Sequence, residues 1–342
     1  MRIVTLGSGT GQATLLRGLR SYDCEVTAIV GVTDNGGHSG QLRRCLRQPQ
    51  VGDTRQCLSA LLEPTSLWGQ LMGHRFRVGD MCGVSVGNIL LAALTERYGG
   101  LNAASAALRQ ATGVPQRVLP VSDGDAQIGA ELQDGRQVIG EWDIITRQPR
   151  SPVVRLFLVP EVAAHPDVVA AIVQADVLVC CPGSLLTGTL AVLLHPGMSA
   201  ALAASRAPCV YICNLMTQPG QTDGYTTQQH LDLLQHYLGR RVDALLLNNT
   251  PLPPDLVALY ARHEARPVVH ALTDSHVAVY QADLVERPDA ETLRTYDRPQ
   301  GAGMAVGLHL IRHDAQRLAA RLMALAQDWL ERQAARPPSE EL

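Results

Sequence analysis

Short apolar runs alternate with amphipathic stretches along most of the chain. The first run, residues 3–6, leads through a glycine-rich turn into a stretch whose apolar positions Leu15, Leu16 and Leu19 share one helical face. Further apolar runs bounded by turn residues predict strands at 25–33, 118–121, 127–132, 137–142, 153–159, 176–181, 208–213, 242–247 and 267–272. Helical periodicity predicts helices at 41–47, 57–62, 87–97, 103–111, 166–174, 184–194, 228–238, 254–262 and from about 315 to 334.

Alternation of strands and helices is typical of an α/β fold. We therefore predict a Rossmann-like, mostly parallel sheet with helices on both faces. Residues 114–160 interrupt the alternation with closely spaced short strands, and Asp134-Gly135 is a hairpin turn signal, so this segment is expected to be a small antiparallel β insertion. We expect a single domain over residues 1–335 and a disordered tail at 336–342. Residues 63–83 lack clean periodicity and are interpreted as a mobile cover.

Composition narrows the class of protein. The 342 residues are 46% hydrophobic and 18% charged, as in a soluble enzyme-sized domain, and the net charge of -3 argues against a nucleic-acid binder. The eight cysteines include no C-x-x-C pair, so reduced core thiols are expected rather than a zinc site or disulfide framework. A strand from residue 3 leaves no room for a signal peptide, and no apolar run approaches membrane-spanning length. A cytoplasmic location without membrane partners is expected.

The first glycine-rich turn is a candidate phosphate site. It consists of Gly7, Ser8, Gly9, Thr10 and Gly11, between the first strand and the first helix. Backbone N–H groups converge at such a helix N-terminus, and the helix dipole adds roughly half a positive charge. The spacing is neither that of a dinucleotide fingerprint nor that of a P-loop, so a tight turn that binds nothing is the alternative.

A second polar turn follows the second strand. Asp34 stands at the carboxyl end of that strand, where doubly wound sheets bind a ribose or a metal-bound phosphate. Asn35, Gly36 and Gly37 continue it as a second glycine-rich turn before a helix. The alternative interpretation of Asp34 is a helix cap or an Asx-turn.

Two further segments carry candidate polar contacts. Asp53 is predicted to be the N-cap of the helix that follows it. Arg55, in the first turn, is a poor partner for the helix dipole and so invites an anionic ligand, with a solvated arginine as the alternative. Asn88 follows Gly87 at the start of another helix.

The second half of the chain adds a third glycine turn. Gly183 and Ser184 lie between a predicted strand and a helix, and Ser184 is expected to contact an anion or a hydroxyl group, because the G-x-S-x-G pattern of a nucleophile is missing. Asn214 opens a polar loop that is long for a plain connection, and such loops are often functional. We predict that the turns at Gly7 to Gly11 and Gly183-Ser184 face one cleft that holds a diphosphate.

Several motifs in order along the chain carry a family resemblance. They are GSGTG with LLRGL, TDNGGHSGQLR, VGDTRQCLSALL, VGNILLAAL, CPGSLLTGTL, YICNLMTQPGQTDGYT and RHD. With them the chain resembles the YvcK/CofD-like family, which comprises bacterial gluconeogenesis factors related to archaeal 2-phospho-L-lactate transferase. The resemblance spans residues 3 to about 325.

The resemblance implies a ligand. It implies binding of a UDP-sugar such as UDP-N-acetylglucosamine, and a role in cell shape and wall synthesis during gluconeogenic growth. It also implies that Tyr260, seven residues before Pro267-Val268, and Arg312 of the RHD motif contact the nucleotide-sugar. A core aromatic for Tyr260 and a surface ion pair for Arg312 are the alternatives.

The sequence is therefore compatible with two functions. The first is a nucleotide-sugar-binding regulator, and the second is a transferase in which Asp34 or Asp53 is catalytic and assists Mg²⁺. In the related transferase a nucleotide-activated phospholactate donates its phospholactyl group to a deazaflavin hydroxyl. The family often has Asp-Asp-Gly-Gly-Ser-Ser-Gly where this chain has Asp34-Asn35-Gly36-Gly37-His38-Ser39-Gly40, and losing one carboxylate weakens a metal-dependent mechanism. Mg²⁺ ligands are not identified from the sequence, and a homodimer is compatible with it.

Overall fold

The computed structural model describes residues 1–274, 276–287 and 310–334. The strands are β1 (Arg2–Gly7), β2 (Glu25–Val30), β3 (Arg117–Pro120), β4 (Gln127–Leu132), β5 (Gln137–Ile139), β6 (Val153–Val159), β7 (Val177–Cys180), β8 (Cys209–Ile212), β9 (Ala244–Asn248) and β10 (Ala278–Ala282). The helices are α1 (Gly9–Leu19), α2 (Gly37–Leu46), α3 (Gly52–Leu61), α4 (Leu67–Gly73), α5 (Val86–Tyr98), α6 (Leu101–Thr112), α7 (Glu141–Thr146), α8 (Pro166–Gln174), α9 (Ala191–Leu193), α10 (Met198–Ala204), α11 (Thr227–Leu238), α12 (Pro254–Arg262) and α14 (Ala315–Ala334). Short 3₁₀ and π-helical turns, η1 (Gly79–Met81) and η2 (Leu185–Leu190), complete the described elements.

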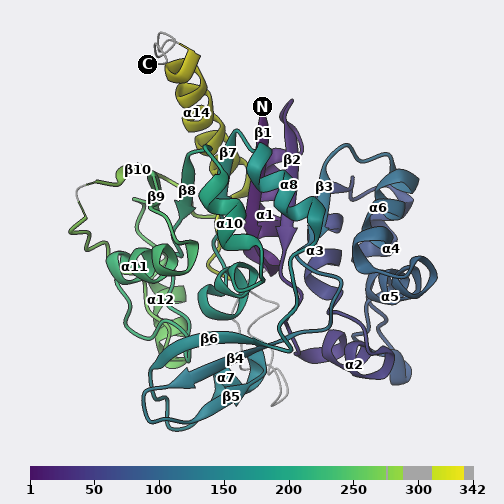
Figure 1. The fold of residues 1–342 in the computed structure, drawn as a ribbon. Helices are drawn as coiled ribbons and strands as arrows, with labels where there is room; N and C mark the ends of the chain where they lie inside the picture. The colour runs from purple at the N-terminus through teal and green to yellow at the C-terminus, as the bar shows by residue number, and fades with distance from the viewer. Residues whose placement is uncertain (275, 288–309, 335–342) are drawn as a thin grey trace.

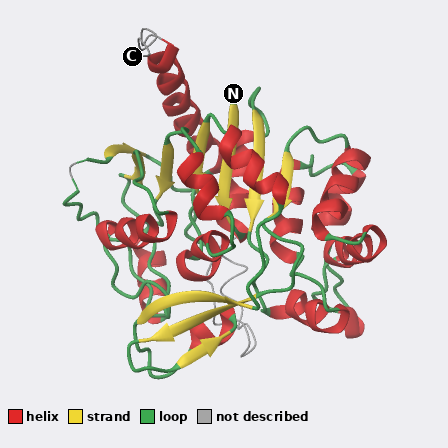
Figure 2. Ribbon diagram, viewed as in Figure 1, coloured by secondary structure: helices red, strands yellow, loops and turns green. Residues whose placement is uncertain are grey.

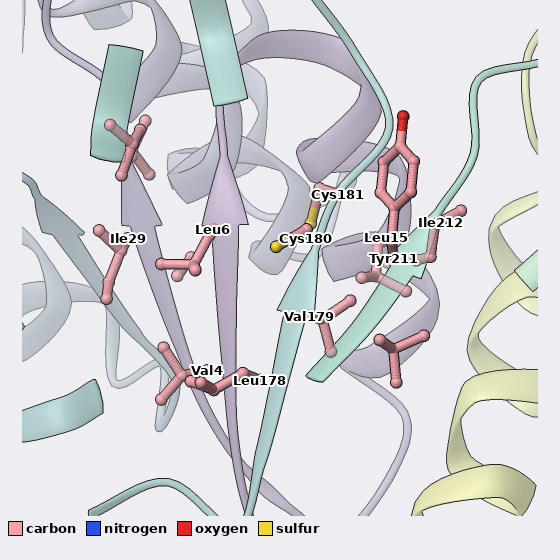
Figure 3. Packing of buried hydrophobic residues seen from close by; sticks show 14 of the residues in the cluster. Val4, Leu6, Leu15, Ile29, Leu178, Val179, Cys180, Cys181, Tyr211 and Ile212 are labelled. Carbon is pink, nitrogen blue, oxygen red and sulfur yellow. The ribbon is translucent and has the colours of Figure 1, made fainter. Parts of the chain in front are cut away.

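A seven-stranded parallel sheet forms the centre of the fold, in the order β10-β9-β8-β7-β1-β2-β3. Its central strands are apolar on both faces, because helices cover both faces of the sheet (Figure 1). Val4, Leu6, Leu178 and Tyr211 are among the side chains that pack there, with at most 2% of each exposed (Figure 3). The predicted fold class, a mostly parallel α/β sheet with helices on both faces and a small antiparallel sheet, is confirmed.

Helix α1 is fixed between the sheet and the last described helix. Its buried Gln12 donates a hydrogen bond from Nε2 to the carbonyl of Ile29 on β2, at 3.0 Å. Gly18 lies so close to α14 that a Cβ there would stand 2.0 Å from the carbonyl oxygen of Ala315. The N-terminus of α1, directly after β1, is therefore held in one place relative to the sheet.

The antiparallel insertion is smaller than the sequence pattern predicts. Strands β4, β5 and β6 form a separate three-stranded sheet, toward which the carboxyl ends of the parallel strands point (Figure 2). Strand β3, predicted as part of the insertion, instead pairs in parallel with β2, and β6 pairs with β4 rather than leading back to the core. The predicted strand 137–142 ends at Ile139, because Gly140 turns the chain at φ +107° into helix α7.

Two other local predictions are corrected. Residues 267–272 form only isolated bridges, to Met216 and Thr226, and the edge strand beside β9 is β10. Asp53 lies in the first turn of α3, whose N-cap is Val51. The segment 63–83 contains helix α4, and its Arg75 forms a bridge to Ser85, while the mobility expected of this segment stays a prediction. The tail predicted at 336–342 lies outside the described residues.

One bent pair of segments in the described part of the chain has the length and composition of a membrane span. Within the described ranges, no single helix is both long enough and apolar enough to cross a membrane. The pair Leu185–Leu193 and Met198–Ala204, bent by 74°, passes by length and composition alone. Its first segment is buried in the protein core.

Candidate functional site

A cavity of about 810 Å³ lies at the carboxyl ends of the central strands. After β1 the chain adds β2 and β3 on one side of it, and it later adds β7, β8, β9 and β10 on the other side. The order of strands in the sheet therefore reverses between β1 and β7, although the two strands run parallel. Doubly wound sheets bind ligands at this kind of topological switch point. The loops after β1, β7 and β8, the side chain of Asp34 after β2, and residues of the insertion line the cavity.

The sequence-predicted residues divide between this cavity and its surroundings. Those that line it are Ser8, Gly9, Thr10, Gly11, Asp34, Asp53, Gly183, Ser184, Asn214, Tyr260 and Arg312. Those that do not are Gly7, Asn35, Gly36, Gly37, Arg55 and Asn88. Asn35 accepts a hydrogen bond from the backbone N–H of Trp142, at 3.0 Å, and so holds the insertion rather than facing the cavity.

The first and third glycine turns touch. A Cβ on Gly11 would stand 1.9 Å from the carbonyl oxygen of Pro182, so only glycine permits this approach. Ser8, the N-cap of α1, makes no side-chain hydrogen bond to the N–H groups of the helix. The N–H groups at the N-terminus of α1 therefore receive no hydrogen bond from a capping side chain, and they border a cavity that the Gly183 turn also lines.

Polar side chains of the loop after β8 hold the Gly183 turn. The side-chain amide of Asn214 makes two hydrogen bonds with the backbone of Gly183. Its Nδ2 donates to the Gly183 carbonyl at 2.7 Å, and the Gly183 N–H donates to its Oδ1 at 3.1 Å. Gln218 adds a longer bond from Nε2 to Oγ of Ser184, at 3.4 Å. Asn214 is thus a positioning residue for the turn, and its amide is already engaged.

Three carboxyl groups line the cavity near the glycine turns: Asp34, Asp53 and Glu141. Burial, followed by the negative charge of Asp34, raises the pKa of Asp53 to about 8. The same two causes raise the pKa of Glu141 well above its ordinary value, although Oγ1 of Thr187 donates a hydrogen bond to its Oε1 at 2.7 Å. Oδ1 of Asp53 would lie 3.4 Å from a Cβ on Gly9, so this group stands beside the first glycine turn.

Glu141 was not found by sequence reasoning. It belongs to α7 of the insertion, in a stretch predicted to be a strand, and it reaches the cavity only because the insertion folds over the sheet edge. The one local signal is Gly140, whose positive φ starts the helix. Within the described residues, no group of three or more His, Cys, Asp or Glu side chains has the arrangement of a metal site.

Tyr260 and Arg312 both line the cavity, and the Tyr260 hydroxyl bonds the two residues just before Arg312. The hydroxyl of Tyr260 accepts hydrogen bonds from the N–H groups of Leu310 and Ile311, both at 3.0 Å, and its ring is only 4% exposed. Arg312 donates to both carboxylate oxygens of Glu286, from Nε and Nη2. The structure thus gives Tyr260 a core position and Arg312 an ion pair, the two alternatives raised from the sequence, while both residues also border the cavity.

The fold and site together define a Rossmann-like α/β protein with an open cavity at the switch point of its sheet. The sequence model of the family described as 2-phospho-L-lactate transferase CofD matches residues 3–285. The chain therefore belongs to the CofD family.

Similar proteins include gluconeogenesis factors. The gluconeogenesis factor of Bacillus subtilis is 39% identical over 270 residues, which are 78% of this chain and 84% of the relative. A relative from Nostoc sp. is 39% identical over 271 residues, 78% of this chain but only 59% of the longer relative. A crystal structure of a UPF0052 family member from Bacillus halodurans superposes with a TM-score of 0.82 at 35% identity, covering 94% of this chain and 99% of that one.

Proposed function

We propose that the large cavity binds a nucleotide-sugar of the UDP-N-acetylglucosamine class, and that the protein acts as a gluconeogenesis factor coupling this ligand to cell shape and wall synthesis. The observation that carries the proposal is the contact between Gly11 and Pro182, which brings two glycine turns to one point. The volume of about 810 Å³ lies within the range of about 300–1,000 Å³ that is usual for small-molecule sites. The name of the Bacillus subtilis relative supports the cellular role. A cytoplasmic location and a homodimer stay predictions.

Buried polar atoms without partners also favour a polar ligand. Oε1 of Gln218 and Nε2 of His313 are buried and make no hydrogen bond within the described part of the chain, and both residues border the cavity. A buried polar atom without a partner costs roughly 1–3 kcal/mol. A ligand with hydroxyl and amide groups, such as an N-acetylated sugar, supplies partners for both atoms.

The family resemblance allows for a bound Mg²⁺ ion. Asp34 and Asp53 could hold this ion only together with the phosphates of a ligand. One or two carboxylates plus substrate phosphates are its usual donors, and Asp34 and Asp53 both line the cavity, with Asp53 beside Gly9 of the first glycine turn. Bound there, the ion would neutralise negative charge between these carboxylates and a diphosphate. Asp53 otherwise retains a proton at neutral pH, because its pKa is about 8.

Calorimetry with UDP-N-acetylglucosamine tests the proposal. Arg312→Ala should weaken binding by about 1.5–3 kcal/mol, the worth of hydrogen bonds to a charged group, because the guanidinium borders the cavity. Arg317→Ala is the matched control, since this arginine is also ion-paired, to Asp283 at 2.5 Å, but does not line the cavity. A folded Arg312→Ala protein with unchanged affinity would remove Arg312 from the site. Failure of the unaltered protein to bind any UDP-sugar would refute the proposed ligand.

The carboxyl cluster favours a transferase as the second candidate function. A carboxyl group with a pKa of about 8 beside the first glycine turn is a stronger base than an ordinary carboxylate once deprotonated, so Asp53 would accept a proton from an attacking hydroxyl above about pH 8. Incubation with a nucleotide-activated phospholactate, a deazaflavin and Mg²⁺ tests this function. Release of the nucleotide together with a phospholactyl-deazaflavin would establish it, and binding of UDP-sugars without product would favour the regulator.

A further inference from the structure

A second pocket, of about 470 Å³, lies beside the large cavity, between α1, α3 and α4. Three arginines line it: Arg17 on α1, Arg55 on α3 and Arg75 after α4. Thr10, Gln56 and Ser59 add hydroxyl and amide groups to the lining. No Asp or Glu is among its described lining residues, so the pocket has strongly positive walls.

The charges of these arginines are not neutralised by the protein around them. Within the described ranges, none of the three guanidinium groups has a carboxylate within 4.0 Å. Burial, and then the like charge of Arg75, lowers the pKa of Arg55 to about 10. Burial and then Arg312 lower the pKa of Arg17. The carboxyl groups with the largest electrostatic effect on these arginines are Asp53 for Arg55 and Glu286 for Arg17, and neither lines the pocket.

Two of the arginines are held in place by the fold. Nε of Arg55 donates to Oδ1 of Asn88 at 3.2 Å, and Nδ2 of Asn88 donates in turn to Oγ of Ser39 at 2.9 Å. The stem of Arg55 packs against Gly87, where a Cβ would stand only 2.8 Å from its Cγ. Nη1 of Arg75 donates to the carbonyl of Gly83 at 2.7 Å. The charges are thus preorganised before any ligand arrives.

The second pocket is a compartment of its own. Thr10 and Gln56 line both cavities, and Oγ1 of Thr10 donates to Oε1 of Gln56 at 3.4 Å between them. Arg17, Arg55 and Arg75 border only the second pocket. An anion held by these arginines is therefore distinct from one held by the glycine turns.

We propose that this pocket binds a phosphate monoester. The three arginines line the pocket from separate elements, and arginine binds phosphate oxygens through paired N–H donors. The phosphate belongs either to a small free metabolite or to a phosphorylated extension of the ligand in the large cavity. This inference goes beyond the proposed function and does not depend on the identity of the nucleotide-sugar.

The test is calorimetry with inorganic phosphate and with phosphoglycolate, in a buffer free of other phosphates. The unaltered protein should bind phosphoglycolate, and R17Q combined with R75Q should weaken that binding at least about tenfold. Both arginines are exposed at one side, so the variant is expected to fold, which thermal unfolding checks. R44Q is the matched control, because Arg44 is an exposed helical arginine outside both cavities.

Repeating the titration with saturating UDP-N-acetylglucosamine distinguishes the two sources of phosphate. Undiminished phosphoglycolate binding supports a free metabolite, and the double variant should then keep its affinity for the sugar nucleotide. Competition, together with loss of sugar-nucleotide affinity in the double variant, supports an extension of the large-cavity ligand. No phosphoglycolate binding by the unaltered protein, or equal binding by the double variant, overturns the proposal, whichever ligand the large cavity takes.

Discussion

The two cavities on either side of the Thr10–Gln56 pair differ in the charged groups that line them. The large cavity mixes both signs, with Asp34, Asp53, Glu141 and Glu264 beside Arg150, Arg262 and Arg312, whereas the second pocket holds three arginines and no described carboxylate. The first turn of α1 borders both. A chain with a net charge of only -3 thus gathers arginines without carboxylates in one pocket and mixes both signs in the other, a difference that the net value conceals.

The two groups of side chains respond differently to burial. Burial raises the pKa values of Asp53 and Glu141, and Asp53, with a pKa of about 8, retains its proton at neutral pH. Arg55 keeps its charge although burial lowers its pKa to about 10. Near neutral pH the large cavity is therefore less negative than its composition implies, while the second pocket stays fully positive. The reduced negative charge of the large cavity and the positive charge of the second pocket both favour an anion at the first turn of α1.

The largest expected effect comes from removing the contact that shapes the large cavity. Gly11→Ala places a Cβ 1.9 Å from the carbonyl oxygen of Pro182, so it should lower the free energy of unfolding by about 2–4 kcal/mol. Gly73→Ala is the control, since nothing lies within 4 Å of a Cβ there, and it should change stability by less than about 0.5 kcal/mol. Urea unfolding measures both. Equal stability of the two variants would mean that the turns do not touch.

A smaller effect is expected from the proton on Asp53. Its folded pKa of about 8 lies above its ordinary value of 3.8, so the native state binds more protons and stability falls as pH rises through that window. Asp53→Asn cannot titrate, and it should be more stable than the unaltered protein at pH 8 by at least about 1 kcal/mol, with the difference shrinking toward pH 4. Asp80→Asn, at an exposed position, should show no such trend. Unfolding curves between pH 4 and pH 8 provide the measurement, and a pH-independent difference for Asp53→Asn would contradict the raised pKa.

The smallest effect concerns the border between the cavities. Thr10→Val removes the 3.4 Å hydrogen bond to Gln56 and should cost about 0.5–1 kcal/mol of unfolding free energy. Thr65→Val, at an exposed position with a similarly long bond of 3.5 Å to Glu63, is the control. Thermal unfolding resolves both. A loss above about 2 kcal/mol at Thr10 would show that more than one weak bond separates the compartments.

Local sequence patterns predicted the main elements well where burial was complete. Strands β1, β7 and β8 are buried along their whole length, or nearly so, and leave apolar runs that are easy to find. Strand β10 is an edge strand with several exposed positions, so its alternation of apolar and polar residues is weak. The apolar residues 267–272 resemble a buried strand more closely, and the sequence pattern therefore predicts the last strand there. The assignment of β3 to the main sheet depends on pairing with β2, which local periodicity does not contain.

The site was predictable where it depends on backbone shape. Gly9 and Gly183 have φ values of +59° and +147°, so their glycines are required locally. The inward position of Glu141 and the grouping of Arg55 with Arg17 depend on tertiary packing between segments distant in sequence. Ligand contacts at the predicted residues stay predictions.

The insertion joins the sheet at two points that nearly meet. The N–H of His165, just before α8, donates to the carbonyl of Val121, just after β3, at 2.8 Å. Everything between them, including Glu141 and the rest of the cavity wall from the insertion, forms one loop of chain that is closed at its base and held against the sheet by side-chain contacts such as that of Asn35. Evolution can exchange or lengthen such a segment without moving a strand of the sheet. Proteins descended from one ancestor can thus keep the same glycine turns and differ in the ligand they recognise through changes in the insertion alone.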